Sequence, residues 1–291
     1  MLIEFTVGNY RSFREPVTLS MEAAAISSED KRVDDNNTIP IRKGLTLLTS
    51  TAIYGANASG KSNLIEALGF MRWMVQNSAR ESQSGDLIKV KPFRLSATTV
   101  RKPTHFEIIF LLEGQRYRYG FEVTPERVLK EWLYRTKTIR EAALFMRSGD
   151  EITPNARSFR EGMRLQERTR PNALFLSVVA QFNGSIAQAV VNWFKKLGFI
   201  SGLEDMGYRD FTLGLYQKDP LQKKQILNLV QSFDTGIEEI AVKKLSPDQV
   251  TLPKDMPEAL KKLVLDSPGD FISMETQHTL FDENGQPVGQ V

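Results

Sequence analysis

The chain has 291 residues, 41% of them hydrophobic and 25% charged, with a formal net charge of +3 at pH 7. This composition is typical of a globular protein, and no apolar run approaches the ~20 residues that a membrane-spanning helix requires, so we expect no membrane contact. The absence of cysteine excludes disulfides and thiolate metal sites, and the N-terminus lacks the pattern of a secretory signal. We expect a cytoplasmic protein; the small positive charge permits contact with nucleic acid but does not require it.

The first fifty residues predict mainly strands. Leu2 to Val7 and Val17 to Met21 are short apolar runs, broken at Gly8-Asn9, that predict an edge hairpin. The polar stretch from Ser27 to Lys43, which contains Asp34 and Asp35, predicts a surface loop. The β-branched and apolar run from Leu45 to Tyr54 predicts a buried central strand.

A phosphate-binding motif follows that run. Residues 55–62 match the pattern G-x-x-x-x-G-K-[ST] at every fixed position, and the apolar stripe of Asn63 to Ala79 predicts the helix that should come after it. The two glycines let backbone N–H groups point at phosphates, the lysine reaches the β- and γ-phosphates, and the serine hydroxyl ligates Mg²⁺. The expected cofactors are ATP and Mg²⁺. The candidate binding residues are Gly55, Ala56, Asn57, Ala58, Ser59, Gly60, Lys61, Ser62 and Asn63, with Ser62 also the metal ligand.

Hydrolysis also needs an acidic residue at the end of an apolar strand. The best candidate strand is Phe106 to Glu113, but Gly114-Gln115 turns the chain straight back. We interpret it as a structural strand, because the metal-binding acid belongs on a central parallel strand. The catalytic residues therefore stay unassigned.

The remaining elements are predicted from changes in the spacing of apolar residues along the chain. Thr104 to Arg147 alternates with period two and predicts an antiparallel meander, whereas Asn172 to Leu197 and Pro220 to Phe233 predict helices, with Phe175, Trp193 and Phe194 in the core. The last residues, from Phe271, predict a hairpin. These changes suggest a P-loop lobe with the meander at 1–150, a helical subdomain at 151–245 and the start of a further lobe at 246–291.

Several motifs carry a family resemblance. Asn9-Tyr10-Arg11-Ser12-Phe13 after an N-terminal strand, together with the motif at 55–63, resembles the RecF, SMC and OLD class of ABC-type ATPase heads. The stretches Lys91-Pro92-Phe93-Arg94-Leu95, Tyr117-Arg118-Tyr119-Gly120-Phe121, Glu131-Trp132-Leu133-Tyr134 and Asn172-Ala173-Leu174-Phe175-Leu176-Ser177 resemble a bacterial AAA group associated with phage defence and abortive infection.

The resemblance implies an α/β fold of ABC-ATPase-head type with an antiparallel β subdomain and a helical subdomain. In such heads two ATP molecules lie between two protomers, and the signature motif and catalytic acids belong to the C-terminal half. The resemblance therefore implies that this chain is the N-terminal portion of a head, which acts as a homodimer or with a complementing C-terminal half. It also implies that the conformational change on dimerisation is passed to an effector such as a nuclease. Arg11 and Ser12 match the segment that approaches the nucleotide.

Arg157, Arg160, Arg164 and Arg168 recur at spacings of three and four, so on a helix they would form one cationic stripe. The stripe is either a nucleic-acid contact or a solvated face balanced by Glu161 and Glu167. The two histidines, His105 and His278, have no partners at ligand spacing, so we expect neither to bind a metal.

We predict an ATP-gated dimerisation switch in bacterial DNA maintenance or antiviral defence. Two alternatives remain: a nucleotide sensor or scaffold that binds ATP without turnover, and a P-loop kinase acting on a small metabolite, which the long meander disfavours. Whether the chain by itself is an active ATPase is left open.

Overall fold

The structure is a computed structural model that describes residues 1–26, 28–42, 44–200, 206–233, 236–246, 249–250, 252, 256–265 and 271–291. The chain divides into two compact units, 1–199 and 200–291. The sequence had instead suggested boundaries near residues 150 and 245. In the described part of the chain, no helix combines the length and the apolar character needed to cross a bilayer.

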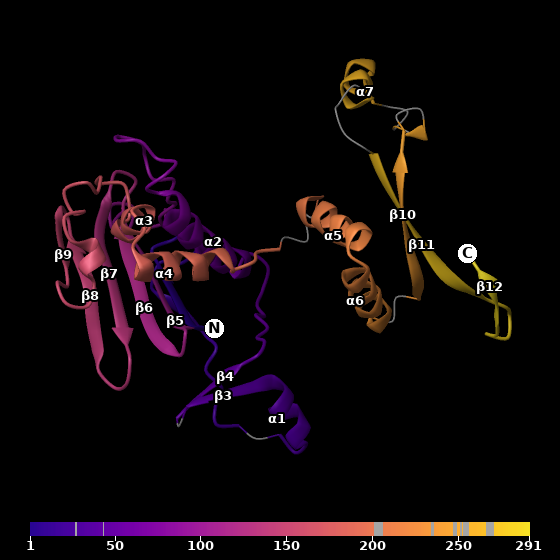
Figure 1. Cartoon of the computed structure of the whole chain (residues 1–291), viewed down its shortest axis with the longest axis horizontal. Helices are drawn as coiled ribbons and strands as arrows, with labels where there is room; N and C mark the ends of the chain where they lie inside the picture. The colour runs from indigo at the N-terminus through magenta and orange to yellow at the C-terminus, as the bar shows by residue number, and fades with distance from the viewer. Residues whose placement is uncertain are drawn as a thin grey trace. The chain divides into compact units, whose positions relative to one another are not determined.

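A seven-stranded antiparallel sheet dominates the first unit, with strands in the order β2-β1-β5-β6-β7-β8-β9 (Figure 1). The strands are β1 (Leu2–Gly8), β2 (Val17–Ser20), β5 (Thr104–Leu112), β6 (Gln115–Val123), β7 (Val128–Thr136), β8 (Glu141–Ser148) and β9 (Glu151–Pro154). The predicted edge hairpin and meander are thus confirmed. Glu113 lies in the β5–β6 turn with φ 51°, as expected of a structural hairpin.

Three helices cover one face of this sheet: α2 (Lys61–Asn77), α3 (Phe175–Gln181) and α4 (Ser185–Lys195) (Figure 1). The stripe of α2 is buried against the sheet, and so are Phe175, Trp193 and Phe194, as predicted. The single long helix expected from Asn172 to Leu197 is wrong, because the chain breaks between α3 and α4. Asn183 has a left-handed φ of 65°, and a Cβ on Gly184 would lie 2.5 Å from Val179 Cγ1.

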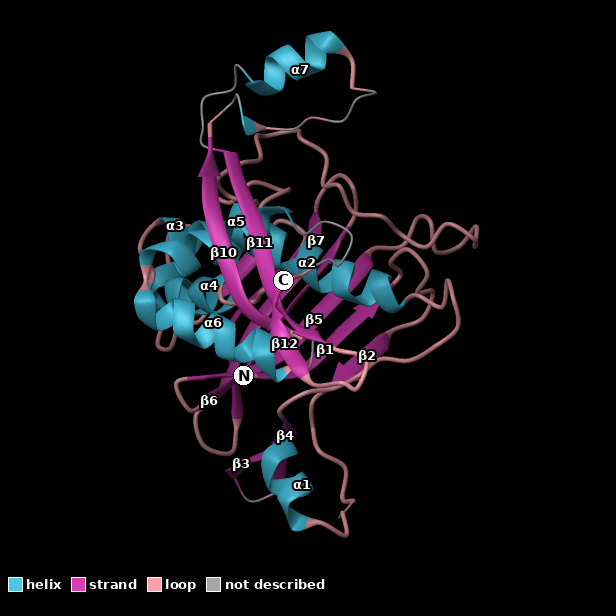
Figure 2. Cartoon of the chain, turned by 90° about the vertical axis from the view of Figure 1, so that its right-hand side faces the viewer, coloured by secondary structure: helices cyan, strands magenta, loops and turns pink. Residues whose placement is uncertain are grey.

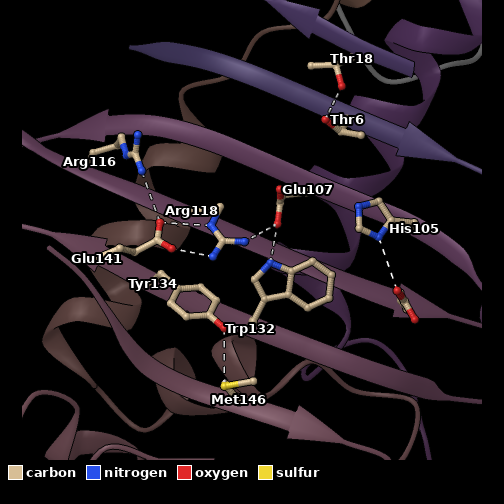
Figure 3. A network of polar contacts seen from close by, with 11 residues as sticks. Thr6, Thr18, His105, Glu107, Arg116, Arg118, Trp132, Tyr134, Glu141 and Met146 are labelled. Carbon is tan, nitrogen blue, oxygen red and sulfur yellow. Dashed lines mark hydrogen bonds and ion pairs between the residues drawn. The ribbon is translucent and has the colours of Figure 1, made fainter. Parts of the chain in front are cut away.

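The opposite face of the sheet carries a polar network (Figure 3) and is covered in part, where Ile109 and Leu111 of β5 pack against the buried Ile3, Leu45 and Leu47. Arg118 donates to Glu141 on β8 and Glu107 on β5, and Glu107 also accepts from Trp132 Nε1 at 2.7 Å. The indole covers Gly120, where a Cβ would lie 2.4 Å from Trp132 Cζ2. Glycine is required there because the ring occupies the space of a side chain.

The segment before the phosphate-binding motif differs from expectation. Residues 27–43 do not form a loop throughout: α1 (Lys31–Asn37) includes Asp34 and Asp35, and β3 (Thr38–Arg42) pairs with β4 (Leu45–Leu48) (Figure 2). The predicted central strand from Leu45 to Tyr54 is also wrong, because it ends at Leu48 and pairs only with antiparallel neighbours among the described residues, β3 on one side and a bridge from Glu22 to Leu47 on the other. Beyond it Ile53 is 38% and Tyr54 91% exposed.

Residues 157–168 do not form the helix on which their arginines would make one cationic stripe. Asn155 Oδ1 accepts hydrogen bonds from the N–H groups of Arg157 and Ser158, as an N-cap residue does. The single turn closed by Phe159 N–H on Asn155 O does not continue, and Phe159 leaves the helical region with φ −143° and ψ 52°. The only regular element described in this stretch is the 3₁₀ helix η1 (Arg160–Gly162), and Arg164 has φ 66°. The four arginines therefore do not share a helical stripe.

The second unit contains helices and a small sheet. Helices α5 (Met206–Lys218) and α6 (Pro220–Ser232) are followed by β10 (Ile237–Leu245), α7 (Glu258–Leu265), β11 (Phe271–Phe281) and β12 (Pro287–Gln290). The predicted helix from Pro220 is confirmed, with Asp219 as its N-cap. The predicted hairpin from Phe271 is confirmed as β11–β12, and β10 pairs with β11 on its other side.

Candidate nucleotide-binding site

The phosphate-binding motif lies in the loop that enters α2. Gly60 is the N-cap residue, with φ 102°, a conformation that suits glycine. It has no side chain, so the first-turn N–H groups of α2 have no side-chain cap. Such N–H groups, together with the positive end of the helix dipole, form a binding site for a phosphate.

Lys61, at the start of α2, folds over this loop. Its Nζ donates to the carbonyl oxygens of Gly55 at 2.7 Å and Ala56 at 2.9 Å. Residues 51–59 are exposed, so the loop is open to a ligand from solvent. A bound triphosphate would offer Lys61 charged acceptors in place of two neutral carbonyls, and charge-assisted hydrogen bonds are the stronger kind.

The loop from Asn9 to Phe13 lies against the motif. Asn9 and Arg11 adopt left-handed φ values of 51° and 45°. Buried Asn9 Nδ2 donates to the carbonyl oxygens of Thr99 and Lys102, both at 2.8 Å, and this anchors the loop. The strained backbone is thus held by a buried side chain that binds a segment far along the chain.

Arg11 and Ser12 contact the first turns of α2. Asn63 Nδ2 donates to Ser12 Oγ at 2.8 Å, and Arg11 Nη1 donates to Asn63 Oδ1 at 3.2 Å. Arg11 also forms an ion pair with Glu66. A Cβ on Gly60 would lie 2.6 Å from Ser12 Oγ, so glycine is needed for close packing as well as for its φ.

An open groove of about 580 Å³ lies beside these residues. It is lined by Arg11, Ser12, Asn63, Lys91, Pro92, Arg94 and Leu95. The backbone ties its two sides together, because Arg11 N–H donates to Lys91 O at 2.9 Å. Lys91 and Arg94, for which the described residues supply no ion pair, make the groove favourable for an anionic ligand, whereas the charge of Arg11 is paired with Glu66. Lys91 and Arg94 had no role in the sequence interpretation; their place in a basic five-residue motif was the only signal.

Ser62 is exposed on the first turn of α2. Mg²⁺ is usually held by one or two protein oxygens together with the phosphates of a nucleotide. The Ser62 hydroxyl fits that requirement as one ligand. No group of three acidic or histidine side chains that could hold a metal occurs in the described ranges.

The other candidate residues lie away from this site or have structural partners. His105 is 3.6 Å from Glu122, whose pKa its hydrogen bond lowers, and its ring packs on Trp132. His278 contacts Thr276 in the second unit. Glu161, expected to balance the arginines, instead accepts from the N–H groups at the start of α4.

The site therefore has the features of a P-loop nucleotide-binding protein: an uncapped helix N-terminus, a left-handed glycine and a lysine above the loop. The comparison with protein families agrees. Residues 50–288 match the family described as "AAA domain, putative AbiEii toxin, Type IV TA system", and the chain belongs to this family. It is thus an AAA-type P-loop domain with an α/β fold. No curated protein matches the chain.

Proposed function

We propose that this chain is the ATP-binding part of an ABC-type head that acts as a nucleotide-gated dimerisation switch. The observation that carries the proposal is the position of Lys61 over the loop at the uncapped start of α2, next to the cationic groove. Helix N–H groups bind the phosphates, Lys61 neutralises the terminal ones, and Ser62 holds Mg²⁺. Arg11 and Ser12 border the nucleotide.

Titration calorimetry with Mg-ATP tests the binding site. Lys61→Ala should weaken binding by about tenfold to a hundredfold, because a hydrogen bond to a charged group contributes about 1.5–3 kcal/mol. Lys89→Ala removes the same charge from an exposed position outside the groove lining and should leave the affinity unchanged. Equal affinity of the Lys61 variant and the wild type would exclude the site.

The proposed switch rests on how open the site is. Residues 51–59 are exposed, and Tyr54 presents 91% of its surface to solvent directly before the motif. The exposed loop leaves one side of a bound nucleotide uncovered, and a second protein surface could complete the site there. We propose that a second head, or a complementing C-terminal half of the same head, covers this segment when ATP is bound. Light scattering with a non-hydrolysable ATP analogue should then show a dimer or a complex, and Lys61→Ala should remain monomeric.

The biological role follows the family description, which names a putative abortive-infection toxin. We propose that the switch acts in antiviral defence or DNA maintenance and controls an effector such as a nuclease. Phage plating would test the role on two strains that express the complete system, one with this chain as wild type and one with its Lys61→Ala variant. Equal protection in both strains would separate defence from nucleotide binding.

A second candidate function is an ATP sensor without turnover. Of the described residues that line the groove, none is a carboxylate, and nearby Glu66 is paired with Arg11. Hydrolysis needs a group that orients water, usually beside an acid that holds Mg²⁺. The turnover measurement described in the Discussion distinguishes the sensor from the ATPase.

A further inference from the structure

A second basic site lies at the far end of the β7–β8 hairpin. A pocket of about 360 Å³ is lined there by Arg135, Lys137, Arg140, Ala142, Leu144, Arg157 and Ser158. We call Arg135, Lys137, Arg140 and Arg157 the hairpin cluster. Arg135 is at the end of β7, Lys137 and Arg140 are in the turn, and Arg157 comes from the turn that Asn155 starts.

No carboxylate lines this pocket, and none is within ion-pair distance of the hairpin cluster among the described residues. The neighbouring acids are engaged elsewhere. Glu141 follows Arg140 directly but is bound by Arg116 and Arg118 on the face that carries the polar network (Figure 3). Glu161 follows Arg157 by four residues but caps α4.

The neighbouring strand β6 shows the contrast between paired and unpaired cations. Arg118 lies between two carboxylates and also covers the Tyr134 ring at 4.2 Å, so its charge is neutralised within the fold. Successive side chains of a strand lie on opposite faces of the sheet, so the Arg135 side chain lies on the other face from Tyr134. The hairpin cluster thus gathers four cations whose mutual repulsion is not offset by ion pairs, and an anionic ligand would relieve it.

The lining also indicates the type of anion. It contains no aromatic side chain on which a base could stack and no acid that could accept from a base or sugar. Cations without base contacts are the set that binds a phosphodiester backbone, and several cations match its successive charges better than they match one isolated phosphate.

We infer that the hairpin cluster is a docking site for the phosphate backbone of duplex DNA, contacted without regard to sequence. The site is separate from the P-loop groove, since the two pockets share no lining residue. Arg157 is the member of the hairpin cluster that belongs to the arginine series at 157–168, and the other three cations come from the β7–β8 hairpin. Arg168 packs over Phe182, and Arg160, Arg164 and Arg168 do not line this pocket.

Fluorescence anisotropy with a labelled random-sequence DNA duplex tests the inference over a range of salt concentrations. The test variant is Lys137→Gln/Arg140→Gln/Arg157→Gln, which changes only exposed side chains. The matched control is Lys31→Gln/Arg101→Gln/Lys196→Gln, which removes the same charge from exposed positions of the same unit outside the pocket. Circular dichroism verifies that both variants are folded, and Mg-ATP titration should give wild-type affinity for both.

We expect the duplex affinity of the test variant at low salt to fall on the order of tenfold to a hundredfold. The slope of log K against log salt concentration should become shallower by about 2–3, because each of the three lost phosphate contacts contributes about 0.9 to that slope. The control should lose less than about threefold, because it removes only general attraction. Equal losses in both variants, or no duplex binding by the wild type at low salt, would overturn the inference. Displacement of the duplex by pyrophosphate at an equal concentration of phosphate would do so as well, because it would indicate a small-anion site.

Discussion

The buried carboxylate of Glu131 offers the sharpest test of how the helical layer is held on the sheet. Glu131 is fully buried on β7 and accepts hydrogen bonds from the N–H groups of Phe175 at 2.6 Å and Leu176 at 3.0 Å. These are the first residues of α3, which has no side-chain cap of its own. The carboxylate also accepts from Tyr119 Oη at 3.0 Å, and strand register places Arg147 opposite it.

Glu131→Ala would leave three buried donors without their acceptor, the N–H groups of Phe175 and Leu176 and the Tyr119 hydroxyl. Each unsatisfied buried group costs about 1–3 kcal/mol, with partial relaxation offsetting some of the sum. We expect the free energy of unfolding to fall by about 3–5 kcal/mol. Glu131→Gln keeps one oxygen acceptor and should lose about 1–3 kcal/mol.

The assay is urea unfolding followed by tryptophan fluorescence. All three tryptophans, Trp73, Trp132 and Trp193, lie in the first unit, so the signal reports on that unit and not on the second. Glu126→Ala, in an exposed turn, is the matched control and should change stability by less than about 0.5 kcal/mol. A Glu131→Ala variant as stable as this control would refute the proposed role of the carboxylate as the cap of α3.

Further predictions concern pH, packing and turnover. Hydrogen bonding to Arg118 lowers the pKa of Glu141 below its ordinary value of 4.5. The ionised Glu141 side chain therefore stabilises the fold above pH 4.5, and this stabilisation is lost as the pH falls through the pKa of the folded state. Glu141→Gln should make the free energy of unfolding less dependent on pH in this acidic range. Gly120→Ala should lower the melting temperature and disturb the Trp132 fluorescence, because its Cβ would overlap the indole ring. Gly60→Ala should weaken Mg-ATP binding at least tenfold by displacing Ser12, while far-UV circular dichroism stays unchanged. In single-turnover assays the chain alone should bind ATP but hydrolyse it negligibly; brisk hydrolysis abolished by Lys61→Ala would show that the catalytic acid lies within these residues.

Local sequence patterns correctly predicted the helices, strands and loops whose conformation depends on neighbouring residues. The alternation of Tyr117, Tyr119 and Phe121 predicted β6 because side chains of a strand alternate between a buried and an open face. The apolar stripe predicted α2, and the motif at 55–62 predicted a phosphate site because its glycines and lysine act through backbone geometry close to them.

Other local predictions failed where a contact distant in sequence decided the conformation. The arginines at 157–168 have helical spacing, but the turn that Asn155 caps ends at Phe159, and Glu161 instead binds the distant start of α4. The run from Leu45 to Tyr54 has strand composition, yet a strand needs a neighbour for its hydrogen bonds, and the described part of the chain supplies one only as far as Leu48.

The sequence by itself determined the class of this protein, because a phosphate-binding loop is encoded in consecutive residues. Only the tertiary structure decided which distant residues join the two candidate sites. Arg11 reaches Asn63 because Asn9 anchors a left-handed loop to residues 99–103, and Arg157 meets the β7–β8 hairpin because the turn at Asn155 places it there. Both arrangements depend on contacts between segments far apart in the chain, which no local period records.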